Sequence, residues 1–301
     1  MIELNFKSSI GTLRGACWNK VVKPWGTLQV SHGLGEYHKR YRDFAEYLNK
    51  QGLIVYCNDH LGHGLHVING MKKGYFGSEE GFTAVVDQFG EMNAYIRREH
   101  LGLKHYVFGH SLGTAVLLSF LKRGVIYEKC ILSASFLTSK FLLFLNSLFL
   151  WPEQKTLGLT EVSRQMEEFT TKRFNSNFKP NRTTHDWLSS NNKSVDEYVE
   201  DDLCGFPNTV KLWMDLKDGF KNLWTKETFK MFDTNNKFLL LTGTEDAVNS
   251  KGSQSEKIHN ILLEAGHASE HNYFQGMRHE ILNETEKKVV YKRIIDFLKT
   301  S

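Results

Sequence analysis

The stretch that most constrains the fold is residues 109–113, which read Gly-His-Ser-Leu-Gly. The preceding residues 104–108 form a short apolar and aromatic run that predicts a buried strand. The following residues 114–121 predict a largely buried helix that ends before Gly124. A strand that turns directly into a helix needs a sharp backbone turn at Ser111, and the two flanking glycines remove the side chains that would collide there.

Strand-like and helix-like segments alternate along the rest of the chain. Strands are predicted at 11–18, 27–32, 53–58, 129–134, 237–243 and 270–275, and helices at 38–51, 81–99, 251–265 and 284–299. This alternation predicts an α/β fold, with a mostly parallel sheet covered by helices on both faces. The last helix is expected to begin with a capping box between Asn283 and Glu286.

The alternation is interrupted once, by residues 136–209, which lack clear strands. We therefore expect residues 1–135 and 210–301 to form an α/β core and residues 136–209 to form an inserted, mainly helical cap. Open α/β sheets bind ligands beyond the carboxyl ends of their strands, so the cap is expected over that edge.

Composition places few other limits on function. The 301 residues carry a net charge of +4 and are 41% hydrophobic, which is ordinary for a soluble globular protein. Lys and Arg are scattered among Asp and Glu, so nucleic acid is not an expected partner. The first residues do not resemble a signal peptide, and four widely spaced cysteines indicate a cytoplasmic location.

Ser111 at the tip of the turn has the setting of a catalytic nucleophile. A serine hydroxyl needs a base to remove its proton and an acid to orient that base. Asp246 follows the strand 237–243, and His279 lies between the last strand and the last helix. All three would meet at one sheet edge, in the order Ser, Asp, His. Glu245 is an alternative acid that the sequence does not exclude.

The same chemistry needs two backbone amides to bind a developing oxyanion. One is expected at Leu112, directly after the nucleophile, and the other at Leu34 in the turn His32-Gly33-Leu34-Gly35. The alternative for that turn is a plain glycine turn with no role in catalysis.

A second glycine-rich loop, residues 59–64, contains Asp59, His60 and His63, with His66 close by. Metal binding is one interpretation, but the spacing is loose and no cysteine is near. We expect no metal there, and instead histidines that hydrogen-bond within the loop and shape the cleft.

The cap contains an apolar stretch at residues 141–151. It is too short to span a bilayer, which needs about twenty residues. Phe141, Phe144, Leu145 and Leu148 recur at helical spacing and predict one apolar face. This face either packs on the core or lines an acyl-binding tunnel, and in the second case the cap is expected to touch a membrane surface transiently.

Together these motifs resemble the α/β-hydrolase group of monoacylglycerol lipases and bacterial lysophospholipases. The resemblance rests on the stretches 32–36, 59–64, 109–113, 243–246 and 278–280, and spans nearly the whole chain. It implies an α/β-hydrolase fold and cofactor-free hydrolysis of a long-chain acyl ester through an acyl-serine. It assigns Ser111, Asp246 and His279 to the catalytic triad, and Leu34 and Leu112 to the oxyanion hole.

Two other functions stay open from the sequence. The same triad could act on a short ester, a thioester or a peptide. The fold could also be an inactive scaffold that binds a ligand, although an intact triad argues against this. The head group of the substrate and the oligomeric state are not determined by the sequence.

Overall fold

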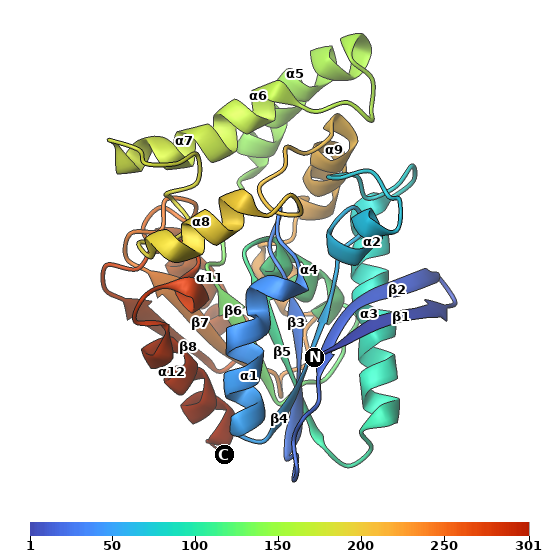
Figure 1. Ribbon diagram of the computed structural model, residues 1–301, viewed down its shortest axis with the longest axis vertical. Coiled ribbons are helices and arrows are strands. Elements are labelled where there is room, and N and C mark those ends of the chain that lie inside the picture. The colour runs from blue at the N-terminus through green and yellow to red at the C-terminus, as the bar shows by residue number, and fades with distance from the viewer. Residues whose placement is uncertain (301) are drawn as a thin grey trace.

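The computed structural model describes residues 1–300, apart from the side chains of residues 140–142. Within these residues the chain forms one eight-stranded sheet with helices on both faces (Figure 1). The strands are β1 (Ile2–Ser8), β2 (Gly11–Trp18), β3 (Gly26–Ser31), β4 (Leu53–Asn58), β5 (Lys104–His110), β6 (Lys129–Ser133), β7 (Lys237–Gly243) and β8 (Ser269–Phe274).

The sheet has the order β1-β2-β4-β3-β5-β6-β7-β8. β2 pairs antiparallel with both β1 and β4, and all other neighbouring strands are parallel. The α/β fold with a mostly parallel sheet is thus confirmed. β1 was not predicted, because it is an edge strand without buried residues and carries only a weak alternating pattern.

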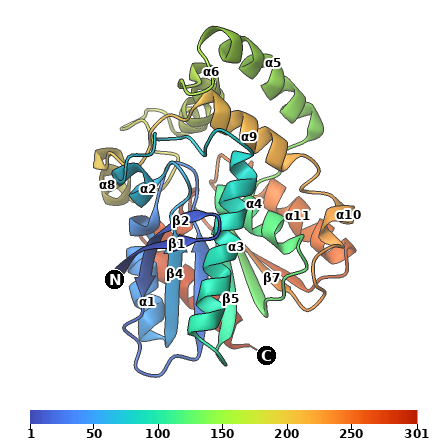
Figure 2. The same ribbon diagram turned by 90° about the vertical axis from the view of Figure 1, so that its right-hand side faces the viewer.

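Two apolar layers hold the helices against the sheet. α1 (Arg42–Lys50) and α12 (Lys287–Lys299) pack on one face, and α3 (Gly81–Glu99), α4 (Leu112–Leu121) and α11 (Ser253–Glu264) pack on the other (Figures 1 and 2). The central strands β3, β4 and β6 are buried along their whole length, as expected for parallel strands covered on both sides. This packing fixes the sheet edge at which the loops meet.

Helices and irregular segments connect β6 to β7, and several lie above the carboxyl ends of the strands (Figures 1 and 2). The helices are α5 (Lys140–Thr156), α6 (Arg164–Glu167), α7 (Arg173–Asn175), α8 (Asn192–Glu200), α9 (Val210–Phe220) and α10 (Lys226–Phe229). We call residues 140–200 the helical layer. α9 contacts both α5 in this layer and α3 in the core, so the limits 136–209 of a separate cap stay a prediction.

The predicted capping box of the last helix is wrong. α12 begins at Lys287, and its preceding residue Glu286 makes no capping hydrogen bond from its side chain. Asn283 instead lies in a 3₁₀ turn, η4 (Ile281–Asn283), where its side chain donates to Glu280. The chain between β8 and α12 is therefore shaped by contacts near His279 rather than by the helix start.

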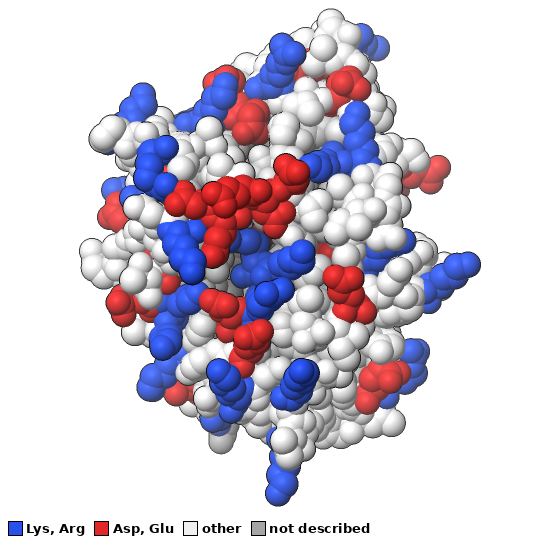
Figure 3. Space-filling model, in the orientation of Figure 1, with Lys and Arg blue, Asp and Glu red and all other residues white. Residues whose placement is uncertain are grey.

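Lys and Arg are interspersed with Asp and Glu on the face drawn in Figure 3. A group of acidic side chains lies over α8 and the residues that follow it. The sequence of this segment contains Asp196, Glu197, Asp201 and Asp202, none of which is buried. No continuous basic stripe is visible on this face of the described chain. The absence of a nucleic-acid partner stays an expectation from the sequence.

Candidate active site

Ser111 sits in a strained turn between β5 and α4. Its backbone φ of 50° and ψ of −118° lie in a region that residues other than glycine rarely adopt. A side chain on Gly113 would collide with the carbonyl of Ser31 in β3, and one on Gly109 would lie 2.6 Å from the Gly113 carbonyl. The amide of Ser111 donates to the Ser133 carbonyl of β6 at 3.0 Å. The turn is thus held against two neighbouring strands.

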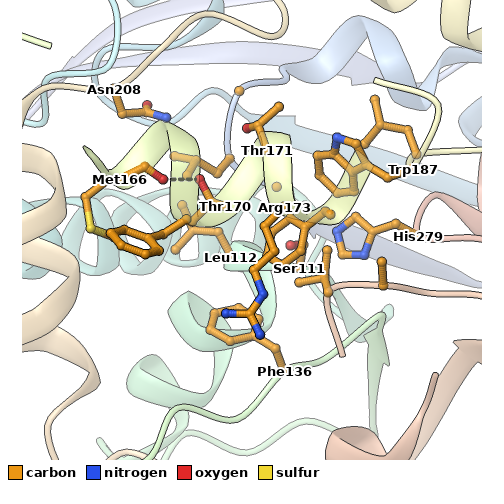
Figure 4. Close-up of a pocket in the computed structure, with 18 of the residues that line it drawn as sticks. Ser111, Leu112, Phe136, Met166, Thr170, Thr171, Arg173, Trp187, Asn208 and His279 are labelled. Carbon is orange, nitrogen blue, oxygen red and sulfur yellow. Dashed lines mark hydrogen bonds between the residues drawn. The ribbon is translucent and has the colours of Figure 1, made fainter. Parts of the chain in front are cut away.

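His279 and Asp246 form a buried pair at the same edge of the sheet. His279 Nδ1 lies 2.9 and 3.0 Å from the two carboxylate oxygens of Asp246, and both side chains are almost completely buried. Burial alone would lower the pKa of His279, but the charge of Asp246 and the hydrogen bond to it outweigh burial, so the pKa is raised. His279 and Ser111 line one cavity, and Figure 4 shows the imidazole beside Ser111.

Asp246 and Glu245, the two candidates for the acid that orients His279, lie in different surroundings. Asp246 is fully buried, accepts a hydrogen bond from the amide of Val248 at 2.9 Å and faces His279. Glu245 is exposed and pairs with Lys251 at 3.3 Å. Only Asp246 is therefore placed to orient the imidazole.

Leu34 and Leu112 both line the cavity that contains Ser111. Among the described residues, neither backbone amide has a hydrogen-bond acceptor, whereas the amides on both sides of Leu34 are occupied. Gly33 donates to Glu36 Oε1 at 2.5 Å, and Gly35 donates to His63 Nε2 at 3.2 Å. This arrangement leaves the two predicted donors available to a ligand.

Glu36 holds this turn through the Gly33 amide, a role that was not predicted from the sequence. Glu36 is 3% exposed and also accepts a hydrogen bond from the Tyr41 hydroxyl at 2.7 Å. Burial raises the pKa of Glu36 to about 7, and the nearby charge of Glu280 adds to the rise. The sequence feature that could have indicated this role is the position of Glu36, an acidic residue directly after the His-Gly-Leu-Gly turn.

The helical layer is attached to the same turn. The Tyr198 hydroxyl of α8 and the amide of Gly205 both donate to the Gly35 carbonyl, at 2.8 and 2.9 Å. Arg40 pairs with Glu280 and donates to the Ser194 carbonyl of α8 at 3.2 Å. These long-range contacts could not be predicted, because their partners are more than 150 residues apart in sequence.

The histidines of the second glycine-rich loop are hydrogen-bonded to the first. The His60 amide donates to His32 Nε2 at 2.9 Å, and His63 accepts from Gly35. Burial lowers the pKa of His60 to about 3 and that of His63 to about 4, so both are neutral at physiological pH. No cluster of three potential metal ligands is found among residues 1–300.

The cavity above Ser111 has a volume of about 910 Å³. Much of its wall is apolar, and this part includes Phe136, Leu145, Phe149, Met166, Phe169 and Trp213. Figure 4 shows Met166 and Trp187 above the level of Ser111, so residues of the helical layer close the cavity from that side. The cavity can hold an extended apolar group next to Ser111.

The apolar face predicted for the helix at 141–151 is only partly placed at this cavity. Leu145 lines it, but Phe144 and Leu148 are 59% and 54% exposed and do not. The prediction that Phe144 and Leu148 face the core or the substrate is wrong. Because α5 is apolar on more than one side, helical spacing alone could not identify the buried side, and the chosen residues include two that face solvent. Phe149 lines the cavity instead. The side chain of Phe141 lies outside the described residues.

The four cysteines Cys17, Cys57, Cys130 and Cys204 are free and buried. The first three pack within the apolar clusters of the core. No helix in the described part of the chain combines the length and apolar character needed to cross a membrane.

A family model and several known proteins match parts of this chain. Residues 22–286 match the family model described as serine aminopeptidase, S33. A monoglyceride lipase homolog of Monkeypox virus is 26% identical over 106 residues, which cover 33% of this chain and 34% of that protein. A monoacylglycerol lipase of Mycolicibacterium smegmatis is 29% identical over 103 residues, or 34% and 35% of the two chains. The chain thus aligns with about a third of these relatives.

Solved structures share the fold over almost the whole chain. A carboxyl esterase from Bacillus coagulans has a TM-score of 0.88 at 21% identity and covers 99% of this chain and 97% of its own. A monoacylglycerol lipase from Paleococcus ferrophilus has a TM-score of 0.68 at 24% identity, with coverage of 95% and 98%. From the family match over residues 22–286, the chain belongs to the serine aminopeptidase S33 family, and it has the α/β-hydrolase fold.

Proposed function

We propose that this α/β-hydrolase is a serine carboxylester hydrolase that cleaves long-chain acyl esters, such as monoacylglycerols or lysophospholipids. The observation that carries the proposal is the buried His279–Asp246 pair, which faces the cavity lined by Ser111. Hydrolysis of such esters needs a nucleophile, a base and an orienting acid, and these three groups supply them.

In this mechanism His279 Nε2 accepts the proton of the Ser111 hydroxyl as its oxygen attacks the ester carbonyl. Asp246 holds the imidazole through Nδ1 and stabilises the imidazolium that forms. The amides of Leu34 and Leu112 bind the oxyanion of the tetrahedral intermediate. The imidazolium then protonates the leaving alcohol, and water hydrolyses the acyl-serine in a second round of the same steps. No cofactor is needed.

The cavity supports a long acyl chain as the substrate group. Each buried methylene contributes about 0.8 kcal/mol of binding free energy, so a chain lying along the apolar wall gains affinity with length. A volume of about 910 Å³ leaves room for both the chain and a polar head group. Short esters would fill only the part of the cavity nearest Ser111.

A peptide substrate is the second candidate, because the family description names an aminopeptidase. Binding a free amino terminus needs an available carboxylate. Within the described chain, each acidic side chain at the cavity already has a partner: Glu36 with Gly33 and Tyr41, Glu245 with Lys251, and Glu280 with Arg40. The ester function is therefore favoured.

We also propose that residues 136–209 act as a cap that meets lipid surfaces transiently. Phe144, Leu148 and Trp151 lie at i, i+4 and i+7 of α5 and are 59%, 54% and 64% exposed. An apolar row exposed on the surface of a helix supports contact with a lipid surface. A cytoplasmic location, peripheral to a membrane, stays a prediction from the sequence.

A chain-length series of nitrophenyl esters tests the function, with monoacylglycerol, lysophosphatidylcholine and an aminoacyl nitroanilide beside it. We expect kcat/KM to rise from acetyl to long-chain esters and no cleavage of the nitroanilide. Cleavage of the nitroanilide without ester hydrolysis would overturn the proposal in favour of a peptidase.

A further inference from the structure

One helical stripe of the layer faces the cavity and carries a single charge. Met166, Phe169, Thr170, Arg173, Phe174 and Asn177 line the cavity at the spacing i, i+3, i+4, i+7, i+8 and i+11. They belong to α6, η2 (Glu168–Lys172), α7 and η3 (Ser176–Phe178), which follow one another without a break. Figure 4 shows the Arg173 side chain extending from this layer into the cavity, toward Phe136. Arginine therefore occupies a position where its neighbours are apolar or neutral.

The other charged side chains at the cavity are already paired. Glu280 pairs with Arg40, Glu245 with Lys251 at 3.3 Å, and Lys217 with Asp218 at 3.4 Å. Glu36 is held by the Gly33 amide and the Tyr41 hydroxyl. Over residues 1–300, the Arg173 guanidinium has no described ion pair or hydrogen bond. Among the described residues at this cavity, the positive charge of Arg173 is therefore available to pair with an anionic group of a ligand.

The chemistry of the guanidinium limits what that ligand group can be. Its planar fork of N–H donors matches the paired oxygens of a phosphate or carboxylate, and it cannot lose its charge near neutral pH. Arg173 is exposed, so a ligand can reach its side chain, and the apolar wall of the cavity lies beside it.

We propose that Arg173 is a specificity-determining residue that binds an anionic group, a phosphate or a carboxylate, of the ester substrate. This inference rests on the proposed ester hydrolase function and deepens it. It selects anionic esters over neutral esters that have the same acyl chain.

The test uses matched substrate pairs that share an acyl chain length and differ in one anionic group, below their critical micelle concentrations. The first pair is a medium-chain monoacylglycerol and its 3-phosphate, which places the anion on the leaving group. The second pair is the nitrophenyl monoester of a dicarboxylic acid and its methyl-capped form, which places the anion on the acyl chain. Wild type, Arg173→Gln, Arg173→Lys and Lys172→Gln are compared. Lys172 is the matched control, because it neighbours Arg173, pairs with Glu168 and does not line the cavity.

For at least one pair, we expect wild type to favour the anionic ester. The ratio of kcat/KM for the anionic to the neutral ester should fall about tenfold in Arg173→Gln, mainly through KM, as expected for losing a charge-assisted hydrogen bond. Arg173→Lys should lose less, and Lys172→Gln should keep the wild-type ratio. The responding pair identifies whether the anion lies on the leaving group or on the acyl chain.

Hydrolysis of neutral esters by wild type and by Arg173→Gln shows that the ester function holds and the variant is folded. If the ratio is then the same in wild type and Arg173→Gln for both pairs, the role of Arg173 is overturned alone. If wild type hydrolyses none of the four esters, the proposed function fails and this inference fails with it.

Discussion

The sheet edge that carries Ser111 and the helical layer above it are held in place in different ways. At the edge, backbone hydrogen bonds to neighbouring strands and hydrogen bonds between buried side chains hold each group in place, as for Ser111 with Ser133 and His279 with Asp246. The layer consists of the long helix α5 and several short helices, and it contributes side chains to the cavity wall. The rings of Phe149 and Phe169, for example, pack with their centroids 4.5 Å apart. The fixed positions of the side chains at the sheet edge suit the cleavage of a bond. The side chains of the helical layer that line the cavity suit the selection of a substrate.

This comparison predicts that changes at the edge lower kcat for every ester, whereas changes in the layer alter KM for particular esters. The variants below separate the two regions, beginning with the largest expected effect.

Asp246→Asn should lower kcat by about 10⁴-fold for short and long esters alike, because the amide no longer orients and stabilises the protonated imidazole. Glu245→Gln is the matched control at the adjacent position, and it should change kcat little because Glu245 is exposed and paired with Lys251. Steady-state kinetics on both variants check this. If Glu245→Gln loses most of its kcat while Asp246→Asn stays active, Glu245 and not Asp246 is the acid that orients His279.

Leu145→Ser combined with Phe149→Ser should raise KM for long-chain esters at least tenfold, because the acyl chain loses apolar contacts worth about 0.8 kcal/mol per methylene. Acetyl and butyryl esters should be hydrolysed nearly as before. The matched control is Phe144→Ser with Leu148→Ser on the exposed side of α5, which should leave KM for monomeric esters unchanged.

Thermal melts of both double variants complete that experiment. If the exposed pair raises KM and the cavity pair does not, the side of α5 assigned to the substrate is wrong. If the cavity pair loses activity toward all chain lengths together with a lower melting temperature, these side chains support the fold instead of the substrate.

The smallest expected effect concerns pH. The activity of wild type should rise with pH through the pKa of His279, which is raised above the ordinary histidine value, because only the neutral imidazole can accept the proton. Negative charge on Glu36 contributes to that rise in pKa. Glu36→Gln keeps an oxygen that can accept from the Gly33 amide but removes the negative charge. The pKa of His279 should therefore fall, and the rise of activity with pH (the acid limb of the profile) should move to lower pH.

Glu245→Gln is the control for the pH profile as well, and its acid limb should match that of wild type. An unchanged limb in Glu36→Gln, or one displaced to higher pH, would contradict the electrostatic link between the oxyanion turn and His279.

Much of the edge could be predicted from sequence because its signals are local. The pattern around Ser111 fixes a strand, a turn and a helix within about twenty residues, and the strand before Asp246 is a continuous apolar run. The structure then brings Asp246 and His279 together as expected. The roles of the triad and of the two oxyanion amides stay proposals until they are tested.

The layer could not be predicted as well, because its arrangement depends on contacts between distant residues. α5 is apolar around most of its circumference, so periodicity could not select which side faces the cavity, and it placed Phe144 and Leu148 wrongly. Arg40 and Tyr198 were missed since their partners become neighbours only in the folded chain. Glu36 was missed although its partners Gly33 and Tyr41 are only three and five residues away. Arg173 carries no sequence signal beyond its place in a helical stripe.

The central claim is that Ser111 is a nucleophile activated by His279. The most direct measurement is mass spectrometry of the peptides after reaction with a fluorophosphonate, which phosphonylates activated serines. We predict one adduct per chain, on the peptide containing Ser111, with no adduct in Ser111→Ala and greatly slowed labelling in His279→Ala. An adduct on another serine, or labelling that persists in Ser111→Ala, would contradict the claim.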